Sequence, residues 1–599
     1  MAHDHADTAD DIERLREKYR AEREKRLRPD GITQYPELKG DYEEFDRDTF
    51  ADPNFTRDPV DETVEVVIVG GGFAGMLTAI HLGELGIRDV RIVEKAGDFG
   101  GTWYWNRYPG CMCDVESYTY LPRLEETGYM PTEKYASAPE IFAYCQLLGR
   151  TYDLYPLALF QTVITDAEWD DAATRWQVRT SRGDRLSAKF LVTAGGILHK
   201  AKLPGIPGIE TFAGKAFHTS RWDYSYTGGG PTEPMDRLSD KRVGIIGTGA
   251  TAVQAVPKLA AAAKELYVFQ RTPSAVGVRD NGPTDVEWFK GLQPGWHEER
   301  VVNFTHAVTG VQPEKNLVAD GWTDVMWVNT QKDTQSEAEL AELERSDFET
   351  MQKLRDRVAS IVEDPATAEK LQPWYGKNCK RVCFHDDYLP TFNRPNVHLV
   401  DTEGKGVERI TPTGVVVAGV EYPVDCLVFA SGFEVNTDLY QRLGFEPKGR
   451  NGVALSERWD QGPRTLHGIL SGGFPNLMII SLVQAGFGTN FVHFLSKSAE
   501  HVANVIATCD DQGIATIEAT DAAEDEWLMV LYGAAGGAAR YVQSCTPGYY
   551  NNEQGAIDAK GARNLVYPGS LLDYAGFLEK WREAGDLAGT AITRVADAG

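Results

Sequence analysis

The stretch Val64-Glu65-Val66-Val67-Ile68-Val69, followed by Gly70-Gly71-Gly72-Phe73-Ala74-Gly75, decides the fold of this chain. The β-branched run predicts a buried strand, and the glycines predict a tight turn into a helix. A second strand, 90–93, ends at Glu94, nineteen residues after Gly75. This order predicts a βαβ unit for a dinucleotide, with Gly70, Gly72 and Gly75 at the pyrophosphate and Glu94 on the ribose. A Gly-rich turn without a ligand is the alternative.

A second unit of the same kind begins at residue 242 and turns through Gly247-Thr248-Gly249-Ala250-Thr251-Ala252. Ala252 fits the third position of the fingerprint, because close packing of helix and strand needs only a small residue there. No carboxylate ends the next strand. Arg271 and Thr272 stand there instead, and a guanidinium and a hydroxyl suit a 2′-phosphate. The first unit therefore predicts FAD and the second NADPH, although an Arg after a strand can also be a plain surface residue.

The composition is that of an ordinary globular protein with more than one core. The chain has 599 residues, of which 42% are hydrophobic and 25% charged, and its net charge is −27. Such a charge argues against nucleic acid and anionic lipid as partners. Eight Cys without a Cys-rich block, the absence of a secretory segment and the absence of a bilayer-length apolar run predict a cytoplasmic protein with free thiols.

The expected fold class is α/β, with two Rossmann-like dinucleotide-binding domains, a helical insertion and an N-terminal helical arm. Residues 1–59 predict a charged helix and a wrapping arm, because the scattered aromatic residues of this region are unusual in a disordered tail. The FAD domain is expected at 60–210 and again at 396–599, where the runs 415–417 and 426–430 should complete it. The NADP domain is expected at 211–395, with the insertion at about 283–375.

Between the two units lies the pattern F-x-G-x-x-x-H-x-x-x-W-D, formed by Phe212, Gly214, His218, Trp222 and Asp223. Together with the two fingerprints and the aromatic segment 100–110, it resembles the type I Baeyer-Villiger monooxygenases over about residues 60–490. The N-terminal helix and arm resemble a subgroup that acts on large or bulky cyclic ketones. The resemblance implies an enzyme that uses FAD, NADPH and O₂ to insert one oxygen atom next to a ketone carbonyl, through a C4a-peroxyflavin, giving an ester or lactone.

The resemblance also implies roles for single residues. The loop 377–383, KNCKRVC, matches the catalytic loop of the family, so Arg381 is expected to be catalytic and Lys380 to contact the NADP phosphate. Asp114 matches the acid that orients this Arg, and it is also expected near the cofactor. Thr102 and Trp103 fall in the aromatic segment and are expected to line the flavin site. The signature Phe212, Gly214, His218, Trp222 and Asp223 is assigned a conformational role between the domains.

Several alternatives stay open. An N- or S-oxygenating flavin monooxygenase is the nearest, although those relatives carry Tyr where this chain has Trp222. An NADPH oxidase without an organic substrate would need the same two cofactors. Cys379, Cys383 and His385 could hold zinc only with a distant fourth ligand, so no metal is expected and buried thiols are preferred. The sequence identifies neither the ketone nor which of Tyr549 and Tyr550 replaces the family's C-terminal Trp.

Overall fold

The computed structural model describes residues 9–311, 313–326, 336–533, 541–554 and 559–595, and the first βαβ unit forms as predicted. β1 (Asp61–Val69) pairs in parallel with β2 (Val90–Val93), and α2 (Phe73–Glu84) connects them. Val66 and Ile68 pack into one hydrophobic cluster, while Val67 packs into another on the opposite face. Because both faces of the sheet are covered, the strand is continuously apolar rather than alternating.

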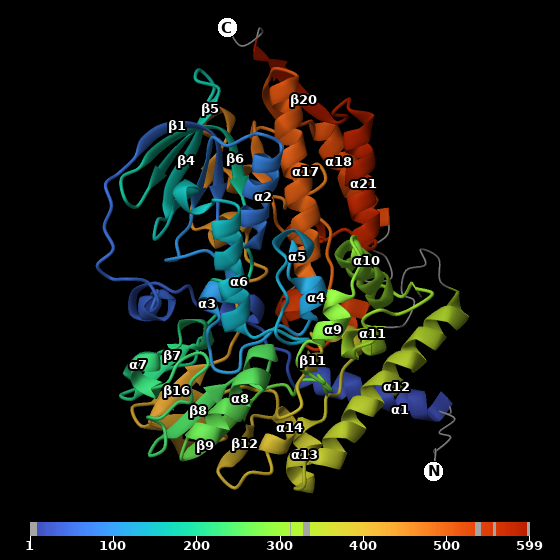
Figure 1. Ribbon diagram of the computed structural model, residues 1–599. Helices are drawn as coiled ribbons and strands as arrows, with labels where there is room; N and C mark the ends of the chain where they lie inside the picture. The colour runs from blue at the N-terminus through green and yellow to red at the C-terminus, as the bar shows by residue number, and fades with distance from the viewer. Residues whose placement is uncertain (1–8, 312, 327–335, 534–540, 555–558, 596–599) are drawn as a thin grey trace.

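The first sheet is completed by strands from distant parts of the chain. Its order is β17-β4-β5-β6-β1-β2-β3, and β18 also pairs with β6. The helices α2 and α17 lie side by side over this sheet (Figure 1). The bounds of its remaining elements are β3 (Ala158–Leu159), β4 (Ile164–Asp170), β5 (Arg175–Thr180), β6 (Arg185–Thr193), β17 (Pro447–Lys448), β18 (Leu477–Ile479), α6 (Ala138–Thr151) and α17 (Phe491–Asp511).

The second unit forms a parallel sheet of order β12-β9-β8-β16-β7, in which α8 (Ala250–Ala262) connects β8 to β9. The strands are β7 (Lys215–His218), β8 (Arg242–Ile246), β9 (Glu265–Gln270), β12 (Val397–Asp401) and β16 (Cys426–Phe429). The expectation that the run 426–430 completes the first domain is wrong, because β16 pairs with β8 and β7. The run 415–417 also lies elsewhere, in β14 (Gly414–Val417), which pairs with β13 (Arg409–Thr411) and β15 (Val420–Pro423). The second sheet therefore uses chain beyond residue 395.

In the described part of the insertion that the charge pattern predicts, the chain forms the helices α9 (Val286–Lys290), α10 (Trp296–Val308), α11 (Gly321–Met326), α12 (Glu337–Ile361) and α13 (Pro365–Leu371). A capping box of Ser336 and Glu339 starts α12. The N-terminal helix α1 (Ala9–Glu24) lies against α12 (Figure 1), where Arg16 bonds Glu344 at 2.6 Å. The charged helix is thus held on the body by the insertion.

The arm that follows α1 docks on both domains, as its aromatic residues predicted. It contains the 3₁₀ turns η1 (Gly31–Gln34) and η2 (Gly40–Asp46). The ring of Phe45 lies 5.5 Å from that of Phe429, in the second sheet, and Phe50 lies 6.2 Å from Tyr104, beside the first. Arg182 stacks on Phe55 at 4.7 Å. The arm is therefore part of the folded body.

Short elements connect the larger ones, and the C-terminal helices α18 (Asp521–Gly533) and α21 (Leu571–Ala584) lie beside α17 (Figure 1). In the part of the chain that the structure describes, no helix is long and apolar enough to cross a membrane. The remaining bounds are α3 (Thr102–Trp105), α4 (Ser117–Tyr120), α5 (Leu124–Thr127), α7 (Tyr224–Thr227), β10 (Val276–Gly277), β11 (Cys383–Phe384), α14 (Tyr388–Thr391), α15 (Leu439–Leu443), α16 (Leu455–Arg458), β19 (Ile514–Ala519), η8 (Tyr549–Gln554), α20 (Ala559–Arg563) and β20 (Thr590–Arg594).

The chain passes between the two sheets twice, after β6 and after β16. The two crossings lie next to each other, and Ala201 forms an antiparallel bridge with Phe433. The backbone N–H of Lys202 donates to the carbonyl of Gly432 at 2.9 Å. The hydroxyl of Ser431 donates to the carbonyl of Lys202 at 2.5 Å. Two chain segments thus form one paired connection between the domains.

Candidate functional site

A single cavity of about 2990 Å³ receives residues from both dinucleotide units. It brings together most of the residues that the sequence singled out: Gly70, Gly72, Glu94, Thr102, Trp103, Asp114, Gly247, Gly249, Arg271, Thr272, Lys380 and Arg381. Gly75 and Ala252 are not among the described lining residues. A Cβ on Gly75 would lie 1.9 Å from the carbonyl oxygen of Gly70, and Ala252 is fully buried. These two positions therefore serve the packing of helix on strand.

The turn of the first unit fits a pyrophosphate. Gly70 has φ +108°, and a Cβ there would lie 2.6 Å from the carbonyl oxygen of Ala194, so only glycine is accommodated. The carboxylate of Glu94 is buried and accepts the backbone N–H groups of Gly71 and Ala96. Burial raises the pKa of Glu94. The carboxylate still lines the cavity, as the assignment to a ribose of FAD requires.

The turn of the second unit leaves space at the cavity. Gly247 has φ +113°, and a Cβ there would lie 2.4 Å from the carbonyl oxygen of Ala430. A Cβ on Gly249 would meet no protein atom within 4 Å, although the residue lines the cavity. A side chain there would fill the space that a phosphate group approaches. Arg271 and Thr272 follow β9 directly, so the residues present fit NADPH.

The guanidinium of Arg271 already holds a carboxylate that sequence reasoning missed. Arg271 bonds Glu553 at 3.0 Å and donates to the side-chain oxygen of Gln34 at 2.9 Å. The ammonium of Lys202 lies 3.5 Å from the other oxygen of Glu553. Lys380 donates to the carbonyl of Pro547 at 2.9 Å. Burial and the charge of Arg271 lower the pKa of Lys380 to about 7.

Arg381 and Asp114 form the ion pair that the resemblance implies. Nη2 of Arg381 donates to Oδ1 of Asp114 at 2.6 Å, and Nε donates to Oδ2 at 3.3 Å. Burial lowers the pKa of Arg381, but the negative charge of Asp114 outweighs it and raises the pKa above its usual value. The guanidinium carbon lies 4.9 Å from the ring of Trp322, whose indole N–H donates to the carbonyl of Asp114 at 2.7 Å. Sequence reasoning missed Trp322, because nothing distinguishes it within the Trp-rich insertion.

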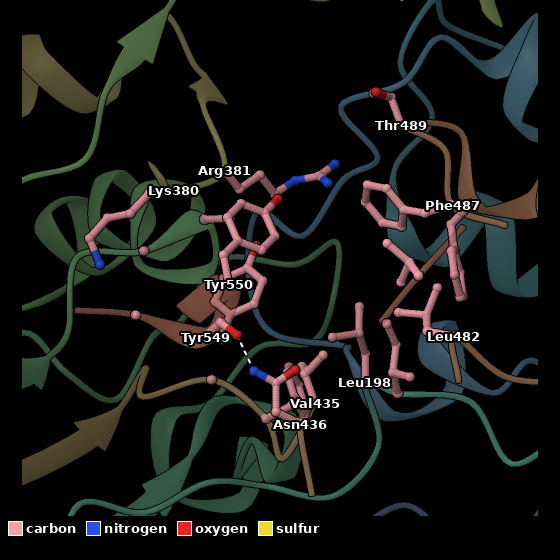
Figure 2. A pocket seen from close by; sticks show the side chains of 18 of the residues that line it. Leu198, Lys380, Arg381, Val435, Asn436, Leu482, Phe487, Thr489, Tyr549 and Tyr550 are labelled. Carbon is pink, nitrogen blue, oxygen red and sulfur yellow. Dashed lines mark hydrogen bonds between the residues drawn. The ribbon is translucent and has the colours of Figure 1, made fainter. Parts of the chain in front are cut away.

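Two tyrosines stand beside Arg381 at the cavity wall. Figure 2 shows the rings of Tyr549 and Tyr550 next to the Arg381 side chain, with apolar residues across the open space. The two rings are 4.4 Å apart. The side chain of Asn436 donates to the carbonyl of Tyr549. The apolar residues that line this part are Leu198, Val435, Leu482 and Phe487. Both tyrosines, rather than one of them, thus lie at the site.

The expectation of free thiols is wrong for two of the eight cysteines. Cys379 forms a disulfide with Cys545, and both residues are buried. A sulfur in this bond cannot serve as a thiolate ligand, so Cys379 is excluded from a zinc site with Cys383. The other six cysteines are buried free thiols, as predicted. The low cysteine content predicts only that most cysteines are reduced. It could not show that Cys379 and Cys545, which are 166 positions apart in the sequence, meet in the fold.

The signature residues lie on β7 and on the chain just before and after it, at the edge of the second sheet, and none is among the described residues that line the cavity. His218 is fully buried at the end of β7, and burial and the charge of Arg221 lower its pKa to about 3. Trp222 is 1% exposed and donates to the hydroxyl of Thr227 at 3.1 Å. Asp223 pairs with Lys215 at 2.6 Å. A Cβ on Gly214 would lie 2.6 Å from the ring of Phe212. Their conformational role between the domains stays a prediction.

Comparisons with known proteins show what this chain is similar to. A family model described as "Pyridine nucleotide-disulphide oxidoreductase" matches residues 67–286. "Neopentalenolactone D synthase" of Streptomyces avermitilis is 48% identical to this chain, over 96% of this chain and 98% of its own length. "Baeyer-Villiger monooxygenase ATR8" of Stachybotrys chlorohalonatus is 47% identical, over 98% of this chain and 95% of its own length.

Among solved structures, the polycyclic ketone monooxygenase from the thermophilic fungus Thermothelomyces thermophila superposes with a TM-score of 0.92 at 40% identity. The match covers 97% of this chain and 99% of that one. Further structural relatives have been solved with FAD and NADP bound together. The chain belongs to the Baeyer-Villiger monooxygenases, and it is an NADPH- and O₂-dependent flavin enzyme that inserts one oxygen atom next to a ketone carbonyl.

Proposed function

We propose that the substrate is a bulky cyclic or polycyclic ketone, bound with its carbonyl at Arg381 and its ring system against the apolar wall across the cavity. The single observation that carries this proposal is the wall itself: Leu198, Val435, Leu482 and Phe487 line the open space that faces Arg381 (Figure 2). Burial of a fused-ring hydrocarbon there gains about 25 cal/mol per Å² of apolar surface. Among the relatives, the solved polycyclic ketone monooxygenase also supports it.

Arg381 is the proposed catalytic residue and Asp114 its positioning partner. Bound FAD, once reduced by NADPH, supplies the oxygen-activating chemistry. The contribution of the chain is a fixed cation for the negative charge that develops on the ketone oxygen. Two hydrogen bonds from Arg381 to Asp114 orient the guanidinium, while 32% of the Arg381 side chain stays exposed toward the cavity. The ring of Trp322 packs against the guanidinium of Arg381, and its indole N–H holds the backbone of Asp114.

The proposed cofactor contacts follow from the lining of the cavity. Gly70, Gly72 and Glu94 would hold the adenosine half of FAD, and Thr102 and Trp103 would contact the rest of it. Arg271, Thr272 and Lys380 would hold the 2′-phosphate of NADPH.

A cytoplasmic location stays a prediction from composition. The disulfide Cys379–Cys545 is the observation that speaks against a reducing compartment, although its burial slows attack by external thiols.

A ketone panel tests the substrate class. We expect kcat/KM to rise from cyclohexanone to steroid-sized fused-ring ketones, because only the larger ones cover the apolar wall. A Leu482→Trp variant should lower kcat/KM for the fused-ring ketones more than for cyclohexanone. A preference for cyclohexanone, or an equal loss for both ketones, would refute the proposal. The ratio of ester formed to NADPH consumed, followed in parallel, distinguishes oxygenation from plain NADPH oxidation.

A further inference from the structure

One buried carboxylate lies among several cations at the far end of the cavity. Glu553 is 5% exposed, bonds Arg271 at 3.0 Å and lies 3.5 Å from Lys202. The hydroxyl of Tyr35, from the N-terminal arm, donates to Glu553 at 3.2 Å. Burial opposes the charged form of Glu553, but the charges of Arg271, Lys202 and Lys380 outweigh it and lower its pKa. Three cations thus share one carboxylate, which leaves positive charge in excess.

The excess positive charge around Glu553 matches a phosphate group better than it matches a carboxylate. A phosphate monoester carries a charge of about −1.5 to −2 at neutral pH and three acceptor oxygens, whereas a carboxylate carries −1 and two. Arg271 is also the residue that the fingerprint assigns to the 2′-phosphate. Glu553 therefore occupies one edge of the Arg271 guanidinium, and a ribose phosphate on that edge would meet a like charge.

The segment that carries Glu553 is held in a strained conformation. Asn552, Glu553 and Gln554 have φ values of +49°, +56° and +63°, three consecutive non-glycine residues in the left-handed region. Such a conformation persists only where side-chain contacts determine it. Cys545, in the disulfide with Cys379, anchors the chain just before the segment. The ion pairs of Glu553 hold the segment itself. If they were lost, residues 552–554 could change conformation while the disulfide still held the chain before them.

We propose that Glu553 is a specificity-determining residue that occupies the 2′-phosphate subsite as a carboxylate stand-in and is displaced by the 2′-phosphate of NADPH. NADH lacks this phosphate and leaves Glu553 on Arg271. The phosphate must break the ion pairs of Glu553 in order to bind, so the carboxylate lowers the affinity for nucleotides that carry a 2′-phosphate. In the free enzyme, the same carboxylate keeps the buried cations paired. This inference rests on the proposed assignment of Arg271 and Lys380 to the phosphate.

Calorimetric titration of the FAD-loaded enzyme with 2′-AMP and with NAD⁺ tests the proposal without turnover. Glu553→Gln keeps the shape of the side chain and removes its charge, so the Kd for 2′-AMP should fall at least tenfold while the Kd for NAD⁺ changes less than twofold. Glu526→Gln is the matched control, because it removes the same charge from an exposed position of α18, and both Kd values should stay within twofold. Glu553→Ala serves if the Gln variant does not fold.

Each outcome separates this inference from the site assignment on which it rests. Unchanged or weaker 2′-AMP binding by Glu553→Gln would overturn the displacement, and weaker binding would make Glu553 a positioning residue for Arg271. Arg271→Ala, titrated in parallel, should weaken 2′-AMP binding at least tenfold, and failure there would refute the phosphate assignment itself. In the wild-type enzyme, NADP⁺ but not NAD⁺ should raise amide hydrogen exchange in peptides covering 549–554. Protection of these peptides by NADP⁺ would contradict displacement.

Discussion

Replacement of Arg381 by Ala removes the cation that faces the ketone. Asp114 fixes the guanidinium through bonds of 2.6 and 3.3 Å, and the Trp322 ring packs 4.9 Å from it, so the charge is already in place before reaction. Loss of one such fixed donor costs about 3–4 kcal/mol of transition-state stabilisation, or about two to three orders of magnitude in rate. We expect ester formation to fall by this factor, while FAD binding and NADPH oxidation persist.

The assay follows ester by gas chromatography and NADPH by absorbance in the same sample. The variant should consume NADPH without a matching amount of ester. Arg381→Lys should recover only part of the ester rate, because one ammonium cannot keep both bonds to Asp114 and also reach the cavity. Arg345→Ala is the control, since it removes an exposed Arg from α12. Ester formation by Arg381→Ala within threefold of the wild-type rate would refute the catalytic assignment.

Three further predictions follow from the cofactor end of the cavity. Arg271→Ala should raise the KM for NADPH roughly 10- to 150-fold, which corresponds to a loss of about 1.5–3 kcal/mol in binding free energy. The KM for NADH should stay unchanged, because only the phosphate loses a charged bond. Equal effects on both KM values would contradict the assignment. The pKa of Lys380 is lowered to about 7, so its ammonium is lost as the pH rises through 7. Since a phosphate ester is already dianionic there, NADP⁺ affinity measured by calorimetry should fall between pH 7 and 9, and less so in Lys380→Met; a flat wild-type profile would exclude this role. Cys545→Ser should lower the melting temperature, because the loss of the disulfide lowers the free energy of unfolding by at most about 5 kcal/mol, the chain-entropy value for a loop of this length. A reductant should lower the melting temperature of the wild type but not that of the variant.

Local pattern was enough to predict the two βαβ units. In the first unit a β-branched strand, a glycine turn and a terminal carboxylate occur within about thirty residues, so neighbouring positions determine the structure. The ion pair of Arg381 with Asp114 was predictable only through the resemblance, because the two residues are 267 positions apart.

The sequence could not predict which sheet receives a short apolar strand. β16 is a run of four buried residues, and nothing in its composition separates the second sheet from the first. Glu553 was missed for a related reason: an acidic residue in a polar C-terminal stretch has the pattern of a solvated residue, and only its contacts to Arg271 and Lys202 reveal its place. The disulfide likewise depends on a distant contact that the low cysteine content did not indicate.

The paired crossings between the sheets determine how the two domains can move. A single linker leaves a domain free to swing and twist in any direction, whereas two neighbouring linkers fix two points and favour rotation about one axis. The bridge between Ala201 and Phe433 and the bond from Lys202 to Gly432 would have to break before either linker could slide along the other. We therefore expect any rotation of one domain relative to the other to follow a single axis through these two linkers, rather than to vary in direction from one turnover to the next.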